Sequence, residues 1–215
     1  MALVTMRKLT RPLIYAFLKK YATNSIILDI GASGDDHREY FPNRTRLDIN
    51  PSKDTDVIGD AHHLPFKEGS FEAVVCSEML EHADDPQKVI SEIHRVLKPG
   101  GLAVLTTRFA FPIHDAPMND YWRFTPYGLR KLFSEFEIIE VATEGGPFYA
   151  VAVQLQRILF QTDLPKIIKG VLYFFFTIFP YLDRLIPHQY GNIERTIEVD
   201  TLLSSGVFIA ARKRG

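Results

Sequence analysis

The sequence predicts an α/β fold: a doubly wound, mostly parallel sheet of seven strands. Apolar runs alternate with helical patterns from about residue 26 to 142, which is typical of βαβ units on a parallel sheet. The first run ends in a glycine turn and the next two end near aspartates, at the edge where such sheets bind ligands. One more apolar run, Gly206–Arg212, follows a long segment outside this alternation.

The strands are expected where short runs of branched and aromatic residues are bounded by turn residues. They are Ile26–Ile30, Arg46–Ile49, Val57–Ile58, Phe71–Cys76, Leu102–Thr107, Phe136–Val141 and Gly206–Arg212. A helix is expected over Pro86–Leu97, because Val89, Ile90 and Ile93 share one face at helical spacing. Asp85 suits its N-cap. A second helix is expected from Thr125 and Pro126 onward.

Composition limits the classes of function. A chain of 215 residues fits one domain with an elaboration. The net charge of −1 provides no overall positive field that would attract nucleic acid. Cys76 is the only cysteine, which excludes an internal disulfide and a multi-cysteine metal site and fits a reducing cytoplasm.

The chain divides into pieces by charge and hydropathy. The pieces are a basic amphipathic helix within residues 1–23, a main domain of residues 24–145 and 204–215, and an apolar helical insertion of residues 146–203. The insertion contains "IIKGVLYFFFTIFPYL", Ile167 to Leu182, which is interrupted by Lys169 and Pro180. It is shorter than the roughly 20 apolar residues of a membrane span, so we do not expect it to cross a membrane.

The stretch "IILDIGASGDD" reads as a strand, a glycine turn and a pair of acids. The dinucleotide pattern G-x-G-x-x-G fails here, because Ser33 and Asp36 stand at its second and third glycine positions. A phosphate beside Asp35 and Asp36 would be repelled, by about 1 kcal/mol at about 4 Å in water and about 4 kcal/mol at an effective dielectric of 20. The turn therefore favours a cationic ligand such as S-adenosylmethionine. The alternative is that these aspartates only cap the next helix, which is compatible with ligand binding.

Two downstream aspartates extend this edge. Asp48 ends the second strand, 19 residues after Asp29, where a carboxylate can accept both ribose hydroxyls. Asp60, in "GDAHHLPF", follows the third strand, where it can accept a hydrogen bond from an adenine amino group. Either aspartate alone is also typical of an exposed loop, but their places at the ends of successive strands favour a nucleoside site.

The ordered runs "LDIGASG", "LDINP", "GDAHHLPF", "SFEAVVCSEMLEH" and "EIHRVLKPGGLAVLTT" resemble the class I S-adenosylmethionine-dependent methyltransferases, in the branch that acts on small molecules and glycolipid-type acceptors. The resemblance covers roughly residues 24–145 and the final strand. It implies a Rossmann-like methyltransferase fold with an antiparallel last strand, and S-adenosylmethionine as cofactor. The residues that it places at the cofactor are Asp29, Gly31, Ala32, Ser33, Gly34, Asp48, Ile49, Asp60, Ala61 and Ser77.

Methyl transfer to a hydroxyl needs a group that removes the proton. His82 is the first candidate base because it follows the fourth strand, with Glu78 and His114 as further candidates. The alternative for His82 is a helix-side histidine bonded to a backbone carbonyl. We expect no metal, because no third ligand is apparent beside Glu78 and His82.

The stretch "HDAPMNDYWRFTP" follows the fifth strand and is dense in polar and aromatic groups. Asp115, Tyr121, Trp122 and Arg123 are candidates to bind a polyhydroxylated or anionic acceptor, since rings pack on sugar faces and arginine pairs with carboxylate or phosphate. The alternative is a surface loop whose aromatic residues plug the core.

The aromatic insertion and the basic start suggest an acceptor with a lipid part and peripheral contact with the inner membrane surface. The alternatives are packing on the sheet or a dimer face. The leading function is methyl transfer, by O-methylation, to a small-molecule, glycan or lipid-linked acceptor in the cytoplasm. A non-catalytic binding protein and a nicotinamide-dependent oxidoreductase are the rival interpretations. Neither the acceptor atom nor the oligomeric state can be read from the sequence.

Overall fold

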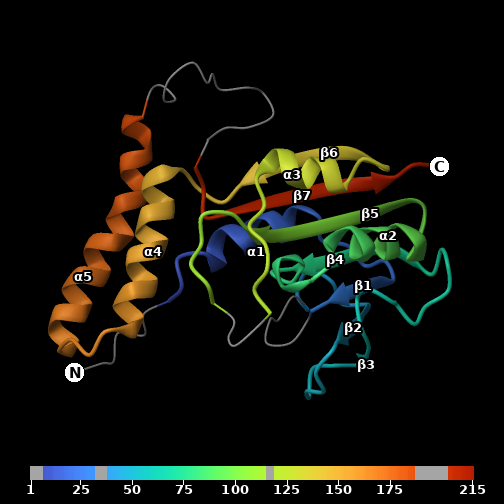
Figure 1. Ribbon diagram of the computed structural model, residues 1–215, viewed down its shortest axis with the longest axis horizontal. Coiled ribbons are helices and arrows are strands. Elements are labelled where there is room, and N and C mark those ends of the chain that lie inside the picture. Colours follow the sequence, from blue (N-terminus) through green and yellow to red (C-terminus); the bar gives the residue numbers. More distant parts are fainter. Residues whose placement is uncertain (1–6, 32–37, 115–118, 187–202) are drawn as a thin grey trace.

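The computed structural model describes residues 7–31, 38–114, 119–186 and 203–215. These residues form a seven-stranded sheet in the order β3-β2-β1-β4-β5-β7-β6 (Figure 1). Neighbouring strands from β3 to β5 run parallel, whereas β7 is antiparallel to both β5 and β6. The predicted doubly wound, mostly parallel sheet with an antiparallel last strand is confirmed.

The strands lie close to the predicted ranges. They are β1 Ile27–Ile30, β2 Arg44–Asp48, β3 Val57–Ile58, β4 Phe71–Ser77, β5 Leu97–Arg108, β6 Phe136–Thr143 and β7 Gly206–Lys213. The largest difference is at β5, which begins at Leu97, directly after the preceding helix. Lys98 to Gly101, which follow the predicted helix, therefore belong to this strand, and the pairing register with β4 shifts between Phe71 and Ala73.

The helices are α1 Arg11–Lys20, η1 Leu80–His82, α2 Pro86–Val96, α3 Pro126–Leu132, α4 Pro147–Gln161, α5 Lys166–Ile178 and η2 Phe179–Leu185. Two predicted N-termini are confirmed by their caps. The Asp85 side chain accepts the Lys88 amide at 3.1 Å, and the Thr125 hydroxyl accepts the Gly128 amide at 3.0 Å. Each bond satisfies an amide that has no partner inside its helix.

Two apolar clusters cover the two faces of the sheet. Val89 and Ile93 of α2 pack with Leu129 of α3 on one face, in a cluster that includes the fully buried Cys76. Phe17 and its neighbours on α1 pack on the other face. The cysteine is therefore core, as its apolar strand predicted.

The described part of the insertion forms α4, α5 and η2, and α4 and α5 lie beyond the edge where the parallel strands end (Figure 1). The Asp183 carboxylate of η2 accepts the amides of Gly146, Phe148 and Tyr149 at 3.2, 2.7 and 3.2 Å, which caps α4. Gln156 of α4 holds the chain before α1, since its side chain bonds the Leu9 amide at 3.0 Å. No helix among the described residues has the length and hydropathy needed to span a bilayer.

Candidate active site

Two adjoining cavities open at the carboxyl ends of the parallel strands. The larger holds about 490 Å³ and is lined by the ends of β1 and β2 and by the segment after β3. The smaller holds about 210 Å³ and lies between the sheet, the start of α1 and the inner face of α4. Gly31, Glu78 and His82 line both cavities, so these residues mark the junction where one bound molecule would meet the other.

Gly31 begins the turn after β1 with φ +73°, a backbone conformation that glycine adopts without strain. A β-carbon there would lie 2.8 Å from both Cβ and Cγ of Met79, which also lines the larger cavity. Its amide donates to the Leu47 carbonyl at 2.9 Å. The turn and the wall of the cavity therefore both require glycine at this position.

Acids line the larger cavity, as predicted. Asp48 ends β2, and its Oδ1 accepts the Asn50 amide at 2.8 Å. Asp60 accepts the His62 amide at 2.9 Å and faces the His62 ring. Burial opposes ionisation of Asp60, but the hydrogen bonds from His62 outweigh it and the pKa of Asp60 lies below its usual value. The carboxylate of Asp60 is thus held in its charged form, which favours a cationic ligand.

The other predicted cofactor residues fall into three groups. Ile49 and Ala61 line the larger cavity. Ser77 is buried and lines the smaller one, with its hydroxyl 2.9 Å from that of Thr106. Asp29 is 1% exposed and lies beneath the turn, with an oxygen 3.6 Å from Nη1 of Arg44. Ala32, Ser33, Gly34 and, on the acceptor side, Asp115 lie outside the described residues.

Glu78 stands at the junction in an unusual backbone conformation. Its φ is 57°, which makes it the only non-glycine residue with positive φ in the described part of the chain. Such strain persists only where the surrounding structure enforces it, and it concentrates at functional sites. The Glu78 amide donates to the Thr106 carbonyl at 2.9 Å, which helps to hold the turn. The side chain is 12% exposed and aims its carboxylate at the guanidinium of Arg108.

Arg108 ends β5 and is shared by two buried carboxylates. Its guanidinium forms an ion pair with Glu78 and a second one with Glu144, at 2.9 Å. Burial raises the pKa of Glu78 and that of Glu144 to about 7, against the opposing effect of Arg108. One positive charge cannot fully compensate two negative ones, so a proton is retained near neutral pH.

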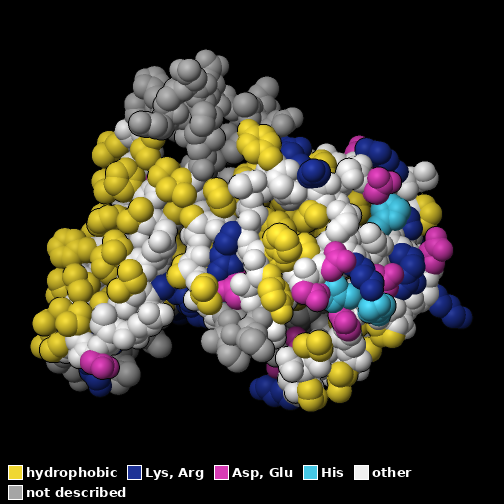
Figure 2. All heavy atoms as spheres, in the orientation of Figure 1, with side chains coloured by type: hydrophobic (Ala, Val, Ile, Leu, Met, Phe, Trp, Pro, Cys, Tyr) yellow, Lys and Arg dark blue, Asp and Glu magenta, His cyan; other side chains and the backbone are white. Residues whose placement is uncertain are grey.

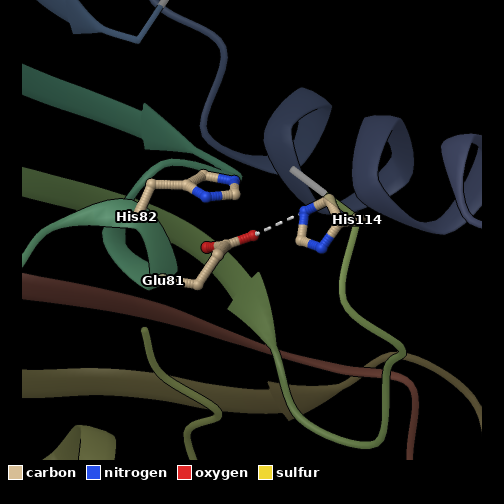
Figure 3. Close-up of side chains that lie close together, drawn as sticks. All are labelled: Glu81, His82 and His114. Carbon is tan, nitrogen blue, oxygen red and sulfur yellow. Dashed lines mark ion pairs between the residues drawn. The ribbon is translucent and has the colours of Figure 1, made fainter. Parts of the chain in front are cut away.

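Glu81, His82 and His114 form a cluster beside this network (Figure 3). Glu81 is fully buried, and its Oε2 accepts the Thr107 hydroxyl at 2.8 Å. The ring of His82 bonds the Asn119 carbonyl through Nδ1. The ring centroids of His82 and His114 are 4.9 Å apart. Burial lowers the pKa of His114 to about 4, so this imidazole is neutral at pH 7.

The ring of His82 bonds a backbone carbonyl, as its alternative interpretation expects, and it also lines the two cavities; its role as a base stays a prediction. Tyr121 lines the larger cavity, whereas Trp122 stacks on Phe124, with centroids 6.4 Å apart, and lines a separate hollow. Arg123 is engaged by Asp120 and donates to the carbonyls of Phe111 and Pro112. Its guanidinium orders its own segment, and Arg123 lines the separate hollow of Trp122 but neither of the two adjoining cavities.

The charged residues of the site that were missed from the sequence include Glu81, Arg108, Glu144 and Arg157. Arg108 had a usable signal, since a charged residue at the carboxyl end of an apolar strand lies at the ligand-binding edge. Arg157 had none, because it belongs to α4 of the insertion and reaches the smaller cavity only through the packing of that helix.

Comparison with known proteins agrees with this geometry. Residues 28–105 match the family described as "Methyltransferase domain". Residues 28–105 are therefore similar to a methyltransferase domain. The match runs from within β1 into β5 and includes the ends of β1 and β2, which line the larger cavity.

Curated relatives align with this methyltransferase domain over part of their length. The ubiquinone/menaquinone biosynthesis C-methyltransferase UbiE of Haemophilus ducreyi is 37% identical over 73 residues, 34% of this chain and 27% of the relative. The demethylmenaquinone methyltransferase of Staphylococcus epidermidis is 33% identical over 97 residues, 42% of this chain and 40% of the relative. The chain thus spans about a quarter to two fifths of these relatives.

Solved structures share the fold of the methyltransferase domain. The 1,6-didemethyltoxoflavin-N1-methyltransferase of Burkholderia thailandensis, with 1,6-didemethyltoxoflavin and S-adenosylhomocysteine bound, superposes with a TM-score of 0.56 at 15% identity, covering 96% of this chain and 79% of that one. The [4+2]-cyclase SpnF superposes with a TM-score of 0.55 at 17% identity, covering 94% of this chain and 79% of that one. This fold therefore accommodates more than one chemistry.

Proposed function

We propose that this protein transfers a methyl group from S-adenosylmethionine to a hydroxyl of a small-molecule, sugar or lipid-linked acceptor. The observation that carries the proposal is the pair of cavities that meet at Gly31, Glu78 and His82. One cavity has the size and the acids for a cationic nucleoside, and the other has the basic groups for an acceptor. Two reactants that meet at one point are what an in-line methyl transfer requires.

The larger cavity suits the cofactor. Its volume of about 490 Å³ lies within the usual range for small-molecule sites. Asp48 would accept the ribose hydroxyls, and Asp60 with Ala61 would frame the adenine. Asp48→Asn keeps the shape and removes the charge, so we expect it to weaken S-adenosylhomocysteine binding by ~10- to 100-fold, the value of a charge-assisted hydrogen bond. The matched control is Asp54→Asn, because Asp54 pairs with Arg46 outside the cavity.

The smaller cavity suits an acceptor with an anionic group. Lys8, Arg11 and Arg157 contribute side chains to its wall. The Arg157 guanidinium lies over the Phe111 ring, 4.8 Å from its centroid, and has no carboxylate partner among the described residues. Burial and the neighbouring Arg108 both disfavour the positive charge of Arg157 and lower its pKa, so the guanidinium would be stabilised by a nearby anion. A carboxylate or phosphate on the acceptor would supply it.

The transfer is a displacement at carbon. The acceptor oxygen forms a bond to the methyl carbon while the carbon–sulfur bond breaks. The electron pair of the broken bond remains on sulfur, which becomes the neutral thioether of S-adenosylhomocysteine. Glu78 receives the hydroxyl proton, because its carboxylate lines both cavities and its pKa of about 7 suits a general base. Alignment of the reactants contributes up to ~7–11 kcal/mol.

The α5 helix supports an acceptor with a lipid part. None of its residues is buried, and Ile167 and Phe174 are 72% and 61% exposed. Figure 2 shows apolar side chains gathered over α4 and α5. An apolar helix with lysines and no acid fits an anionic bilayer surface. Vesicles containing anionic lipid should therefore sediment the wild-type protein and release Phe174→Glu, whereas equal recovery in the supernatant with and without vesicles would reject the contact.

C-methylation is the second candidate, because both curated relatives described above are quinone-pathway enzymes and UbiE is named a C-methyltransferase. The deciding experiment incubates the protein with methyl-labelled cofactor and fractionated extract, and then identifies the product by mass spectrometry and NMR. A labelled O-methyl group supports the proposal, and a labelled C-methyl group replaces it with the second candidate. Cofactor binding without transfer to any fraction would indicate a non-catalytic binding protein.

A further inference from the structure

We propose that Glu81, His82 and His114 form a binding site for a divalent transition-metal ion at the edge of the acceptor cavity. One carboxylate oxygen and one nitrogen from each ring lie within 4.8 Å of one another. The three side chains converge from η1 and from the segment after β5 (Figure 3). The sequence offered no third ligand beside Glu78 and His82, whereas folding brings Glu81 and His114 to that histidine.

Each ligand is held by a partner on its far side. His82 donates from Nδ1 to the Asn119 carbonyl, which orients its ring. Asp120 Oδ2 accepts the His114 amide at 2.9 Å and lies 3.3 Å from Nδ1 of the same residue. Oriented histidines of this kind are characteristic of metal sites, where the outer partner fixes the tautomer and the direction of the ring.

Glu81 supplies an independent indication. Its side chain is fully buried, and Oε2 bonds the Thr107 hydroxyl, but Oε1 has no hydrogen-bond partner. Oε1 instead points toward Nε2 of His114 at 3.8 Å (Figure 3). A buried carboxylate oxygen without a partner is costly, and a cation between Glu81 and the two rings would satisfy it.

The donor set selects the class of metal. Two imidazoles and one carboxylate suit Zn²⁺, Fe²⁺ or Mn²⁺, whereas Mg²⁺ and Ca²⁺ prefer oxygen ligands alone. Three protein ligands would leave a coordination position open, as in catalytic zinc sites. Both histidines line the acceptor cavity, so that position would face the acceptor. If the proposed methyl transfer is correct, the ion would lower the pKa of the acceptor hydroxyl and Glu78 would take its proton.

A second group of histidines, His62 and His63, differs from the proposed site in its partners and its exposure. The two nitrogens of His62 are already engaged by Asp60 and Asp84, at 2.6 and 2.9 Å. The neighbouring His63 is 69% exposed and lies 2.6 Å from Nζ of Lys88. This exposed group is where adventitious metal would bind, so His63→Ala is the matched control for variants of the proposed site.

The first experiment measures Zn²⁺ binding to the metal-free, full-length protein by calorimetry, without cofactor. We expect one ion per chain, with affinity reduced at least about tenfold in His114→Ala and in His82→Ala and unchanged in His63→Ala. Circular dichroism and cooperative unfolding in urea show whether each variant is folded. The proposal is overturned if no Zn²⁺ binds, or if the His63 variant loses the ion while the folded His82 and His114 variants keep it.

The second experiment separates this site from the proposed function. Labelled methyl transfer is measured in wild-type protein treated with a chelator and then supplied with Zn²⁺ or Mn²⁺. Loss and metal-specific recovery of transfer support a role of the ion at the acceptor. Full transfer by demonstrably metal-free protein overturns that role and leaves the methyltransferase intact, whereas one bound Zn²⁺ without transfer to any acceptor would leave the metal site and reject the function.

Discussion

Replacing Gly31 by alanine tests whether the turn after β1 is fixed by both backbone conformation and packing. Alanine at φ +73° incurs a strain of roughly 1–2 kcal/mol. The added methyl also lies 2.8 Å from Met79, and overpacking of this kind costs about 1–3 kcal/mol. We therefore expect Gly31→Ala to lower the free energy of unfolding by about 2–5 kcal/mol.

Gly100→Ala is the matched control. Gly100 has φ +75°, but a β-carbon there would meet nothing within 4 Å, so only the backbone strain of roughly 1–2 kcal/mol applies. The change in unfolded-chain entropy is common to both variants and cancels in their difference. Urea unfolding, read as a shift of midpoint at constant slope, measures each free energy.

The Met79 contact is isolated by a double-mutant cycle. Adding Met79→Ala to Gly31→Ala should recover about 1–3 kcal/mol relative to the sum of the single effects, because the truncated side chain leaves room for the methyl. The Gly31 variant should also bind S-adenosylhomocysteine more weakly, since Met79 lines the cofactor cavity. Equal destabilisation by Gly31→Ala and Gly100→Ala, or additivity in the cycle, would refute the packing argument.

Three further predictions follow from charged residues. Arg157→Ala should raise the KM for the acceptor at least about tenfold, with Arg157→Lys intermediate and cofactor affinity unchanged. Asp183→Ala should lower the free energy of unfolding by about 1–2 kcal/mol, because it uncaps α4. Because the pKa of Glu144 rises from 4.5 to about 7 on folding, the folded state holds the proton more tightly. The free energy of unfolding should thus fall by about 3 kcal/mol as the pH rises from 4.5 to about 7. Glu144→Gln should flatten this pH dependence, as measured by urea unfolding at several pH values.

The cofactor side of the site could be predicted because its information is local. Asp48 and Asp60 follow successive strands, and parallel strands end at one edge, so strand assignment alone places both acids together. Strand ends were less certain. The segment after α2 reads as a helix stop because of Pro99 and Gly100, yet it continues directly as β5.

The acceptor side could not be predicted in the same way, because its residues converge only on folding. Arg108, Glu144 and Arg157 come from β5, from the residue after β6 and from α4, and no spacing in the sequence relates them. Arg123 was chosen as an acceptor-binding residue from its residue type alone. Its donors suit an anionic acceptor, but Asp120, three residues earlier, already occupies them.

The charges of the two cavities explain how one protein can order two reactants. The net charge of −1 hides a separation in which Asp48, Asp60 and Asp84 line one cavity, while Lys8, Arg11 and Arg157 line the other. In the proposed reaction, a cationic cofactor would be attracted to the first cavity and an anionic acceptor to the second, so that they would meet only at the junction. Transfer removes the charge on sulfur, and with it the attraction of the acids for the sulfonium. The same charges that order the reactants would thus favour release of the product.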